Sequence, residues 1–242
     1  MDDETLRAAV AGHHWFHSIA LRPGIVTPGV KTPDIMAAEE EALFGPLALG
    51  GLSVLDIGAW NGGFSLAALR RGAARVLATD SFTWDHPWFR GRAAFDLACA
   101  ATGLVPEARR LDPTELPAGL EPFDVTLFLG VFYHLRDPIP VVAALGEVTR
   151  LLCLLETHED AAEHERPAMV FYPGRELADD PTSWWGPNPP LVRALLAQAG
   201  FDRVLRRPHP LPDVAPSRGM YAAFRPDAPV AMVQPFRDAG WS

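Results

Sequence analysis

The sequence predicts an α/β fold with a mostly parallel, Rossmann-like sheet, and three observations carry this prediction. A strand-like run that ends at Ile57 leads through a glycine-broken turn into an Ala- and Leu-rich segment with helical character. A second apolar run, over residues 75–79, ends in Asp80. Further along the chain, expected strands alternate with expected helices, which is typical of parallel βαβ units with right-handed crossovers.

Each element can be placed in order along the chain. The N-terminal part is expected to form a helix over 4–11, a turn-rich piece over 22–29 and a helix over 33–47. The expected strands cover residues 52–57, 75–79, 107–111, 123–129, 151–156, 201–206 and 219–225. The expected helices between them cover residues 63–71, 88–102, 138–149 and 189–199, and the last closes on Gly200 in the position of a C-cap. A long polar segment after Glu156, to about residue 180, and the tail from Pro226 are expected to be irregular.

The composition is that of a globular protein. A chain of 242 residues with 48% hydrophobic residues suits one α/β domain with a small appendage. We divide it into an N-terminal helical lid over 1–48 and a core over 49–242. No run of 18 apolar residues predicts a membrane span, and the polar N-terminus does not resemble a signal peptide. Cys99 and Cys153, both flanked by apolar residues, are expected to be reduced thiols of a cytoplasmic protein.

The charge balance bears on the class of partner. The formal net charge is −9, and acidic residues surround the local arginine clusters. Proteins that bind nucleic acid usually present a basic surface, because neutralising phosphates drives their affinity. The composition therefore disfavours a large polyanionic substrate such as tRNA, without excluding one.

The glycine-broken turn predicts a nucleotide-type ligand. Gly58 and Gly62 let the backbone approach a ligand closely, and the first N–H groups of the following helix are free donors. Asp80, at the tip of the next strand, is placed to accept the hydroxyls of a ribose. The third glycine of a dinucleotide motif is missing, and Trp60 stands within the turn. The alternative is a turn whose glycines serve packing alone.

A second motif follows the nearly continuous apolar strand over 123–129. Gly130 opens a turn at the carboxyl end of this strand, which is the edge where open α/β sheets bind ligands. Tyr133 and His134 come just after it and are candidates for the substrate side. The alternative is that Tyr133 packs in the core and His134 caps the next helix.

Taken together, the motifs resemble one family. They are W-F-H-S-I, G-I-V-T-P-G, V-L-D-I-G-A-W-N-G-G-F-S, F-L-G-V-F-Y-H-L-R-D-P, Glu156-Thr157 and W-W-G-P-N, spread over roughly residues 13–225. This set resembles the class I S-adenosylmethionine (SAM) methyltransferases related to the tRNA wobble-uridine 5-oxyacetate enzymes, some of which are similar to natural-product methyltransferases. The resemblance implies a seven-stranded sheet that ends in an antiparallel hairpin, an N-terminal helical lid, and SAM as the cofactor.

The resemblance also implies a set of cofactor-binding positions. They are Asp56, Gly58, Trp60, Gly62, Asp80, Ser81, Asp112, Leu129 and Gly130. Gly58 and Gly62 would wrap the methionine end of SAM, with Asp56 orienting the turn or the amino group. Asp80 would hold the ribose. Asp112 would accept from the adenine amino group, although an Asp before Pro is also a common turn starter.

On the acceptor side, methyl transfer needs a positioned acceptor and, for some acceptors, removal of a proton. The candidate catalytic residues are His17, Tyr133 and His134, since a histidine pKa lies near neutrality. The candidate substrate-binding residues are Trp15, Phe16, Trp184 and Trp185. The alternatives are that the first two anchor the core and that the paired tryptophans pack on the lid. The tract with His158, Glu163 and His164 has metal-ligand composition, but a solvated loop is favoured and no metal is expected.

The sequence departs at two positions from the family that it resembles, and these positions decide which function we expect. The tRNA enzyme of this family uses carboxy-SAM and grips the extra carboxylate with a Lys, an Arg and a Tyr. Here His17 occupies the place of the Lys, and Arg218 is a loose match for the Arg. We therefore expect a methyltransferase that uses plain SAM on a small-molecule acceptor, a hydroxyl of a secondary metabolite, and that is compatible with a homodimer. The alternatives are a tRNA wobble-uridine methyl- or carboxymethyltransferase and a SAM-binding subunit without catalysis.

Overall fold

The computed structural model describes residues 1–242, which form two compact units, Met1–Asp112 and Pro113–Ser242. The seven strands of the main sheet have the order β10-β11-β7-β6-β3-β4-β5. Two further pairs, β1-β2 and β8-β9, form small antiparallel ribbons. The α/β class and the mostly parallel seven-stranded sheet predicted from the sequence are confirmed.

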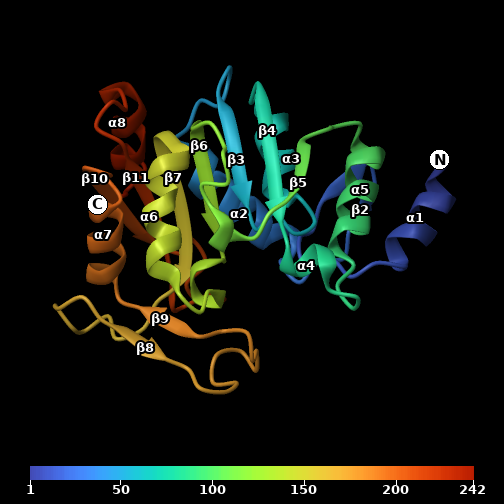
Figure 1. Ribbon diagram of the computed structural model, residues 1–242. Helices are drawn as coiled ribbons and strands as arrows, with labels where there is room; N and C mark the ends of the chain where they lie inside the picture. Colours follow the sequence, from blue (N-terminus) through green and yellow to red (C-terminus); the bar gives the residue numbers. More distant parts are fainter. The chain divides into compact units, whose positions relative to one another are not determined.

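The first unit holds three parallel strands of this sheet (Figure 1). Its elements are α1 (Asp3–Ala11), β1 (Ala20–Arg22), β2 (Ile25–Val26), α2 (Pro33–Phe44), β3 (Ser53–Ile57), α3 (Gly63–Arg70), β4 (Arg75–Asp80), α4 (Phe82–Asp85), α5 (Gly91–Thr102) and β5 (Glu107–Arg110). Strand β4 lies between β3 and β5, so the carboxyl ends of all three strands lie at one edge. This edge carries the glycine turn and Asp80.

Local signals explain where the N-terminal helices begin. The Asp2 side chain accepts a hydrogen bond from the Thr5 N–H at 2.8 Å and so caps α1. Thr32 caps α2 in the same manner, with Pro33 in the first turn, where no N–H is needed. The buried face of α1 then packs, together with the segment that follows it, against α5.

The second unit holds the other four strands. Its elements are a 3-10 turn η1 (Pro113–Glu115), β6 (Phe123–Leu129), a 3-10 turn η2 (Phe132–His134), α6 (Pro138–Val148), β7 (Thr149–His158), β8 (Met169–Phe171), β9 (Trp185–Pro187), α7 (Pro189–Gln198), β10 (Arg203–Pro208), β11 (Arg218–Phe224) and α8 (Val230–Asp238). Strands β6 and β7 are parallel, whereas β11 runs antiparallel to both β7 and β10. The predicted closing hairpin is therefore confirmed.

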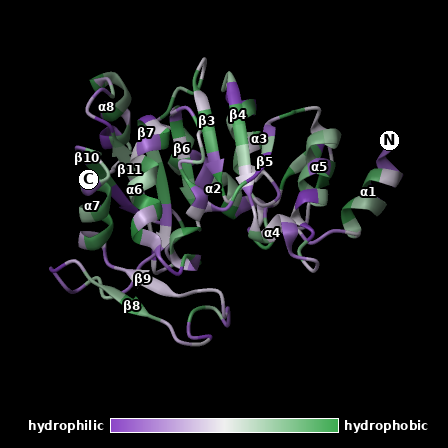
Figure 2. Cartoon of the chain, viewed as in Figure 1, coloured by the Kyte–Doolittle hydropathy of each residue, from purple (hydrophilic) through white to green (hydrophobic).

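The interior of this unit is apolar over long stretches. Most residues of β6, β7 and β11 are buried, as expected for strands covered on both faces. Figure 2 shows mostly hydrophobic colouring along β6 and α6. This packed body gives the polar side chains at the ends of β7 and β11 a rigid support.

Several sequence predictions need correction. The segment from Glu156 to about residue 180, predicted to be irregular, contains the strand β8, which pairs with the later strand β9, and β7 itself continues to His158. The tail from Pro226 is not irregular, because α8 buries Val233 and Phe236 against the unit. The ribbon β1-β2 and the short helix α4 were also not predicted, and the division of the chain at residue 48 stays a prediction. None of the helices is long and apolar enough to cross a membrane, and both cysteines are free thiols.

Candidate functional site

The glycine turn after β3 adopts backbone dihedral angles that are unfavourable for most residues other than glycine. Gly58, Trp60 and Gly62 have positive φ angles of 78°, 46° and 80°. A Cβ atom at Gly62 would lie 2.7 Å from the Phe95 ring, so only glycine fits there. The N–H groups of Gly58 and Ala59 both donate to the Thr79 carbonyl, which ties the turn to β4.

Two buried carboxylates hold this turn in place. Asp56 accepts a hydrogen bond from the Ser65 hydroxyl at 2.6 Å, and burial raises the pKa of Asp56 to about 6. Asp80 accepts from the Trp60 N–H through one oxygen and from the Thr83 N–H through the other, both at 3.0 Å. Burial also raises the pKa of Asp80. The predicted pairing of the glycine turn with the tip of β4 is thus a direct contact.

A pocket of about 390 Å³ opens beside the tips of β4 and β5. Its lining includes Ser81, Phe82 and Asp112, and the Ser81 hydroxyl donates to the Asp112 carboxylate at 3.0 Å. The Phe82 ring is 53% exposed and offers a flat apolar face. An apolar face beside a carboxylate suits an aromatic heterocycle that carries an amino group.

The segment before β1 covers the glycine turn. The Phe16 ring stacks on Trp60 with a centroid distance of 4.4 Å and an interplanar angle of 1°. The Phe16 N–H donates to the Asn61 side chain at 2.7 Å. Trp15, in contrast, is buried, and its indole N–H donates to the Val10 carbonyl. The sequence allows two interpretations of Trp15, a substrate-binding residue or a core anchor, and its burial favours the core anchor.

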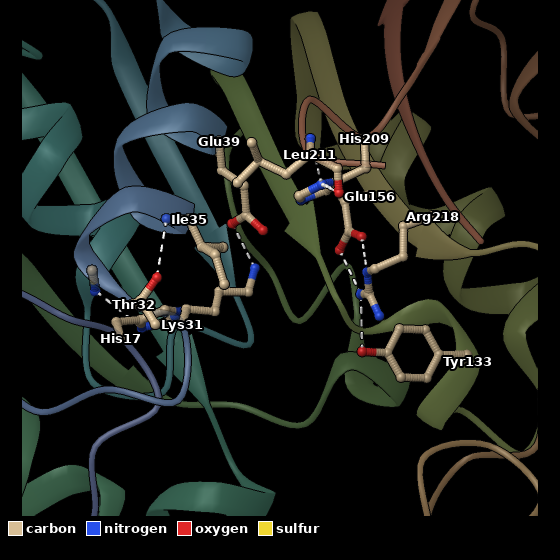
Figure 3. Close-up of polar contacts among 11 residues, drawn as sticks. His17, Lys31, Thr32, Ile35, Glu39, Tyr133, Glu156, His209, Leu211 and Arg218 are labelled. Carbon is tan, nitrogen blue, oxygen red and sulfur yellow. Dashed lines mark hydrogen bonds and ion pairs between the residues drawn. The ribbon is translucent and has the colours of Figure 1, made fainter. Parts of the chain in front are cut away.

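His17 is buried under the first turn of α3. Its Nδ1 accepts a hydrogen bond from the Gly63 N–H at 3.4 Å. Nearby, Lys31 forms an ion pair with the buried Glu39 at 2.6 Å (Figure 3). Burial, together with the Lys31 charge, lowers the pKa of His17 to about 3. His17 is therefore neutral at pH 7, and its contacts support a positioning role rather than that of a proton acceptor.

This low pKa predicts a pH-dependent contribution of His17 to stability. The unfolded chain binds a proton at His17 below about pH 6.5, whereas the folded chain does so only near pH 3. Stability from His17 is thus present at neutral pH and is lost as the pH falls from 6.5 towards 3. The expected loss by pH 5 is about 2 kcal/mol.

Urea unfolding at pH 7.5 and pH 5 measures this effect against His17→Gln, which keeps an acceptor for the Gly63 N–H. The difference in the free energy of unfolding between wild type and variant is compared at the two pH values. From pH 7.5 to pH 5 it should change by about 2 kcal/mol in favour of the variant. An unchanged difference would mean that His17 is not buried as described.

In the second unit, polar groups gather at the carboxyl ends of β6 and β7. The Arg218 guanidinium forms a two-point ion pair with Glu156, and its Nη2 donates to the Tyr133 hydroxyl at 3.1 Å (Figure 3). The side chain of Glu156 is 2% exposed and that of Arg218 is 23% exposed. Gly130, with φ of 71°, lies above this cluster, since a Cβ there would lie 3.5 Å from the Tyr133 hydroxyl.

The other predicted acceptor-side residues contact the ribbon β8-β9 and its loops. His134 Nδ1 lies 3.1 Å from both the carbonyl and the hydroxyl oxygen of Thr182, and burial lowers the pKa of His134. The Arg136 guanidinium lies 4.1 Å from the Trp184 ring centroid, and the Trp185 indole donates to the Arg136 carbonyl. Both tryptophans are half-buried by these contacts.

Several curated sequence relatives share one name. A tRNA U34 carboxymethyltransferase of Pseudomonas putida strain W619 is 32% identical over 162 residues, which is 65% of this chain and 48% of the relative. The enzyme of the same name from Pseudomonas fluorescens strain SBW25 is 33% identical over the same share. The chain therefore spans about half the length of the curated relatives it matches. No family model matches the sequence.

Solved structures have a fold similar to that of this chain over most of its length. The N-terminal domain of EvdMO1, determined in the presence of S-adenosylhomocysteine (SAH) and D-fucose, has a TM-score of 0.64 at 21% identity and covers 93% of this chain and 97% of that domain. The fold is that of a class I SAM-dependent methyltransferase. The 1,6-didemethyltoxoflavin-N1-methyltransferase of Burkholderia thailandensis, with SAH bound, has a TM-score of 0.59 at 19% identity and covers 80% of this chain and 79% of that one. The resemblance read from the sequence motifs is thereby confirmed.

The methyltransferase fold distributes the predicted cofactor positions over both units. The first unit contains Asp56, Gly58, Trp60, Gly62, Asp80, Ser81 and Asp112, and the second contains Leu129 and Gly130. Within the first unit the structure joins Trp60 to Asp80 and Ser81 to Asp112. Both contacts lie at the carboxyl ends of the strands β3, β4 and β5 in the first unit.

Sequence reasoning missed the partners of several site residues. The pairs Lys31–Glu39 and Glu156–Arg218, and the contacts of Tyr172 with His158 and Asp160, join residues 8 to 62 positions apart. One signal was available for Glu156, because a lone acid at the end of an apolar strand needs a partner when it is buried. No spacing rule could have identified which cation provides it.

Proposed function

We propose that this protein transfers a methyl group from SAM to a hydroxyl group of a small molecule such as a secondary metabolite. The observation that carries the proposal is the paired arrangement of acids in the first unit. Asp80 holds the glycine turn through the Trp60 N–H, and Asp112 lies in the neighbouring pocket with Ser81 and Phe82. Ribose hydroxyls and an adenine amino group need acceptors of this kind.

The residues present fit SAM by their chemistry. The Asp80 carboxylate can accept from ribose hydroxyls, and Asp112 can accept from the adenine amino group while Phe82 covers the ring. The Trp60 indole N–H is buried without a hydrogen-bond partner, so a donor is left over within the turn. When bound, SAM supplies a methyl group already activated on a sulfonium. The protein then has to position the acceptor and remove its proton.

Two observations support plain SAM over carboxy-SAM. The place where the resembling tRNA enzyme has a lysine is occupied by His17, which is neutral at pH 7. Arg218, the loose match for its arginine, is already neutralised by the Glu156 carboxylate. An additional carboxylate on the cofactor would therefore meet no uncompensated positive charge from either residue.

A second candidate is a tRNA U34 modification, because the curated relatives carry that name. The net charge of −9 weighs against it, since tRNA affinity depends on basic groups. A filter-binding titration with tRNA at 50 and 200 mM salt separates the two candidates. Tight binding that weakens steeply with salt would favour the tRNA substrate and contradict the small-molecule proposal.

Tyr133→Phe tests the acceptor side of the proposal. The variant removes a hydroxyl that lies beside Arg218 at the carboxyl end of β6 but outside the glycine turn. We expect kcat to fall by about 10-fold or more, since a positioned polar contact to the reacting groups is lost, while the Kd for SAM stays within 2-fold.

Calorimetry with SAM and transfer of a radiolabelled methyl group to a mixture of phenols and sugars provide the two readouts. An unchanged kcat would remove Tyr133 from the acceptor site. A wild-type protein that binds SAM and methylates nothing would favour the non-catalytic subunit.

A further inference from the structure

A chain of hydrogen bonds at the end of β7 links three side chains of the second unit. His158 Nε2 lies 2.9 Å from the Tyr172 hydroxyl oxygen. The same hydroxyl donates to the Asp160 carboxylate at 2.6 Å. The second oxygen of Asp160 accepts from the Ala161 N–H, which fixes the orientation of the carboxylate.

The direction of these bonds determines the tautomer of His158. Tyr172 has one hydroxyl proton and donates it to Asp160, so its oxygen can only accept from the histidine. The pKa of Asp160 is lowered, first by the Tyr172 hydrogen bond, and the pKa of Tyr172 is raised, first by burial. Asp160 is therefore ionised and Tyr172 is protonated at neutral pH. His158 must then carry its proton on Nε2 and a lone pair on Nδ1.

His158 also lies beside the cluster at the ends of β7 and β11. It follows Glu156 by two residues, so the two side chains share one face of the sheet. Its register partner on β11 is Arg218, which bonds the Tyr133 hydroxyl. His158 is half-buried, and its Nδ1 has no hydrogen-bond partner in the protein. A lone pair is thus left on the face of the sheet that carries Glu156 and Arg218.

The ribbon β8-β9 is shaped to hold this arrangement. A Cβ atom at Gly186 would lie 2.4 Å from the Tyr172 hydroxyl and 2.6 Å from the Asp160 Cβ, so the absence of a side chain there makes room for both. The ribbon is also joined to the turn that carries Tyr133, since the Trp184 N–H donates to the Tyr133 carbonyl at 2.7 Å. Such support is expected where a side chain must be held for chemistry.

We propose that His158 is the general base of the methyl transfer and that Tyr172 and Asp160 are its positioning residues. This inference rests on the proposed function. The acceptor O–H bond breaks and its proton moves to His158 Nδ1. The electron pair left on oxygen forms the bond to the methyl carbon, and the pair of the broken C–S bond stays on the sulfur of the donor. The imidazolium that forms donates from Nε2 towards Tyr172 and is stabilised through Asp160.

The charged groups around His158 set the pH range in which it can act. Burial and the Arg218 charge lower the pKa of His158, while the carboxylates of Asp160, Glu156 and Glu159 raise it. The net result is a lowered pKa, so the neutral base form predominates at pH 7. The rate should fall at acidic pH as Nδ1 becomes protonated. Tyr172→Phe removes the link to Asp160 and should shift that acidic limb to lower pH.

Imidazole nitrogen NMR of the full chain, labelled with ¹⁵N-histidine, tests the arrangement without any acceptor. His158 is assigned by its absence from the spectrum of His158→Gln. At pH 7.5 we expect its Nε2 to be protonated and its Nδ1 to be unprotonated, and we expect Tyr172→Phe to mix the two tautomers. A proton on Nδ1, or a fully protonated ring at this pH, would overturn the proposal.

Kinetics of two glutamine variants tests the chemical role. His158→Gln should lower methyl transfer from labelled SAM to a mixture of phenols and hexoses by at least about 100-fold, with the Kd for SAM within 2-fold. His164→Gln, which changes an exposed histidine of the neighbouring loop, is the control and should keep the wild-type rate. A His158→Gln rate within 3-fold of wild type would contradict the inference while leaving the proposed function intact.

A wild-type protein that does not bind SAM would instead contradict the proposed function. If the wild type binds SAM but labels no probe, the proposed function is weakened and the tautomer result decides whether His158 is held as a proton acceptor.

Discussion

Asp80→Ala is expected to weaken SAM binding by about 1.5–3 kcal/mol, or roughly 10- to 150-fold. The variant removes the carboxylate that lies at the tip of β4 and would accept from the ribose hydroxyls. It also removes the acceptor for the Trp60 and Thr83 N–H groups, so the glycine turn loses one of its ties to β4. Titration calorimetry with SAM and with SAH gives the affinity directly.

A matched control separates lost ligand contacts from lost structure. Asp80→Asn keeps the size of the side chain and one acceptor oxygen for the turn, but it removes the charge. We expect its melting temperature to stay closer to wild type than that of Asp80→Ala, while its affinity for SAM still falls. Unchanged affinity in both variants would mean that Asp80 serves the turn alone.

Arg218→Met is expected to lower the free energy of unfolding by about 3–5 kcal/mol. The Glu156 carboxylate is 2% exposed, and the variant removes the guanidinium that neutralises it. Breaking a buried ion pair from one side costs far more than the pair itself contributes, because a charge stays behind in an apolar setting. Denaturant unfolding measured by circular dichroism provides the free energy.

Two further variants make this prediction decisive. Arg150→Met removes an ion pair with Asp124 in which the arginine side chain is 57% exposed, and it should cost less than about 1 kcal/mol. The double variant Arg218→Met, Glu156→Gln should regain part of the loss, since the buried charge is gone. If Arg218→Met is no more costly than Arg150→Met, the cluster at the end of β11 is not buried as described.

Most of the sheet strands were predictable because they are runs of apolar residues bounded by turn signals. Strand 123–129, for example, matches β6 without a shift at either end. The ribbon β8-β9 was not predictable, because strands of three residues are too short to show a period. Helix α8 was missed because Pro235 lies inside it, although the spacing of Val233 and Phe236 was a usable signal.

The site was predictable where neighbouring residues define it. The glycines of the turn and Asp80 follow strand ends directly, so their common edge could be inferred from the order of elements. The role of His17 was harder to foresee, since its low pKa arises from burial and from Lys31, which a sequence pattern does not reveal. Glu156–Arg218 and His158–Tyr172 depend on how β7, β11 and the ribbon pair, and that pairing is fixed by tertiary packing.

Native mass spectrometry of the full chain, mixed with equal amounts of SAM and carboxy-SAM, tests the central claim most directly. We predict a complex with one SAM, because His17 is neutral and Arg218 is paired with Glu156. A complex with carboxy-SAM would contradict the account of both residues and favour the tRNA modification. A spectrum with neither adduct would contradict the assignment of the glycine turn, Asp80 and Asp112 to the cofactor.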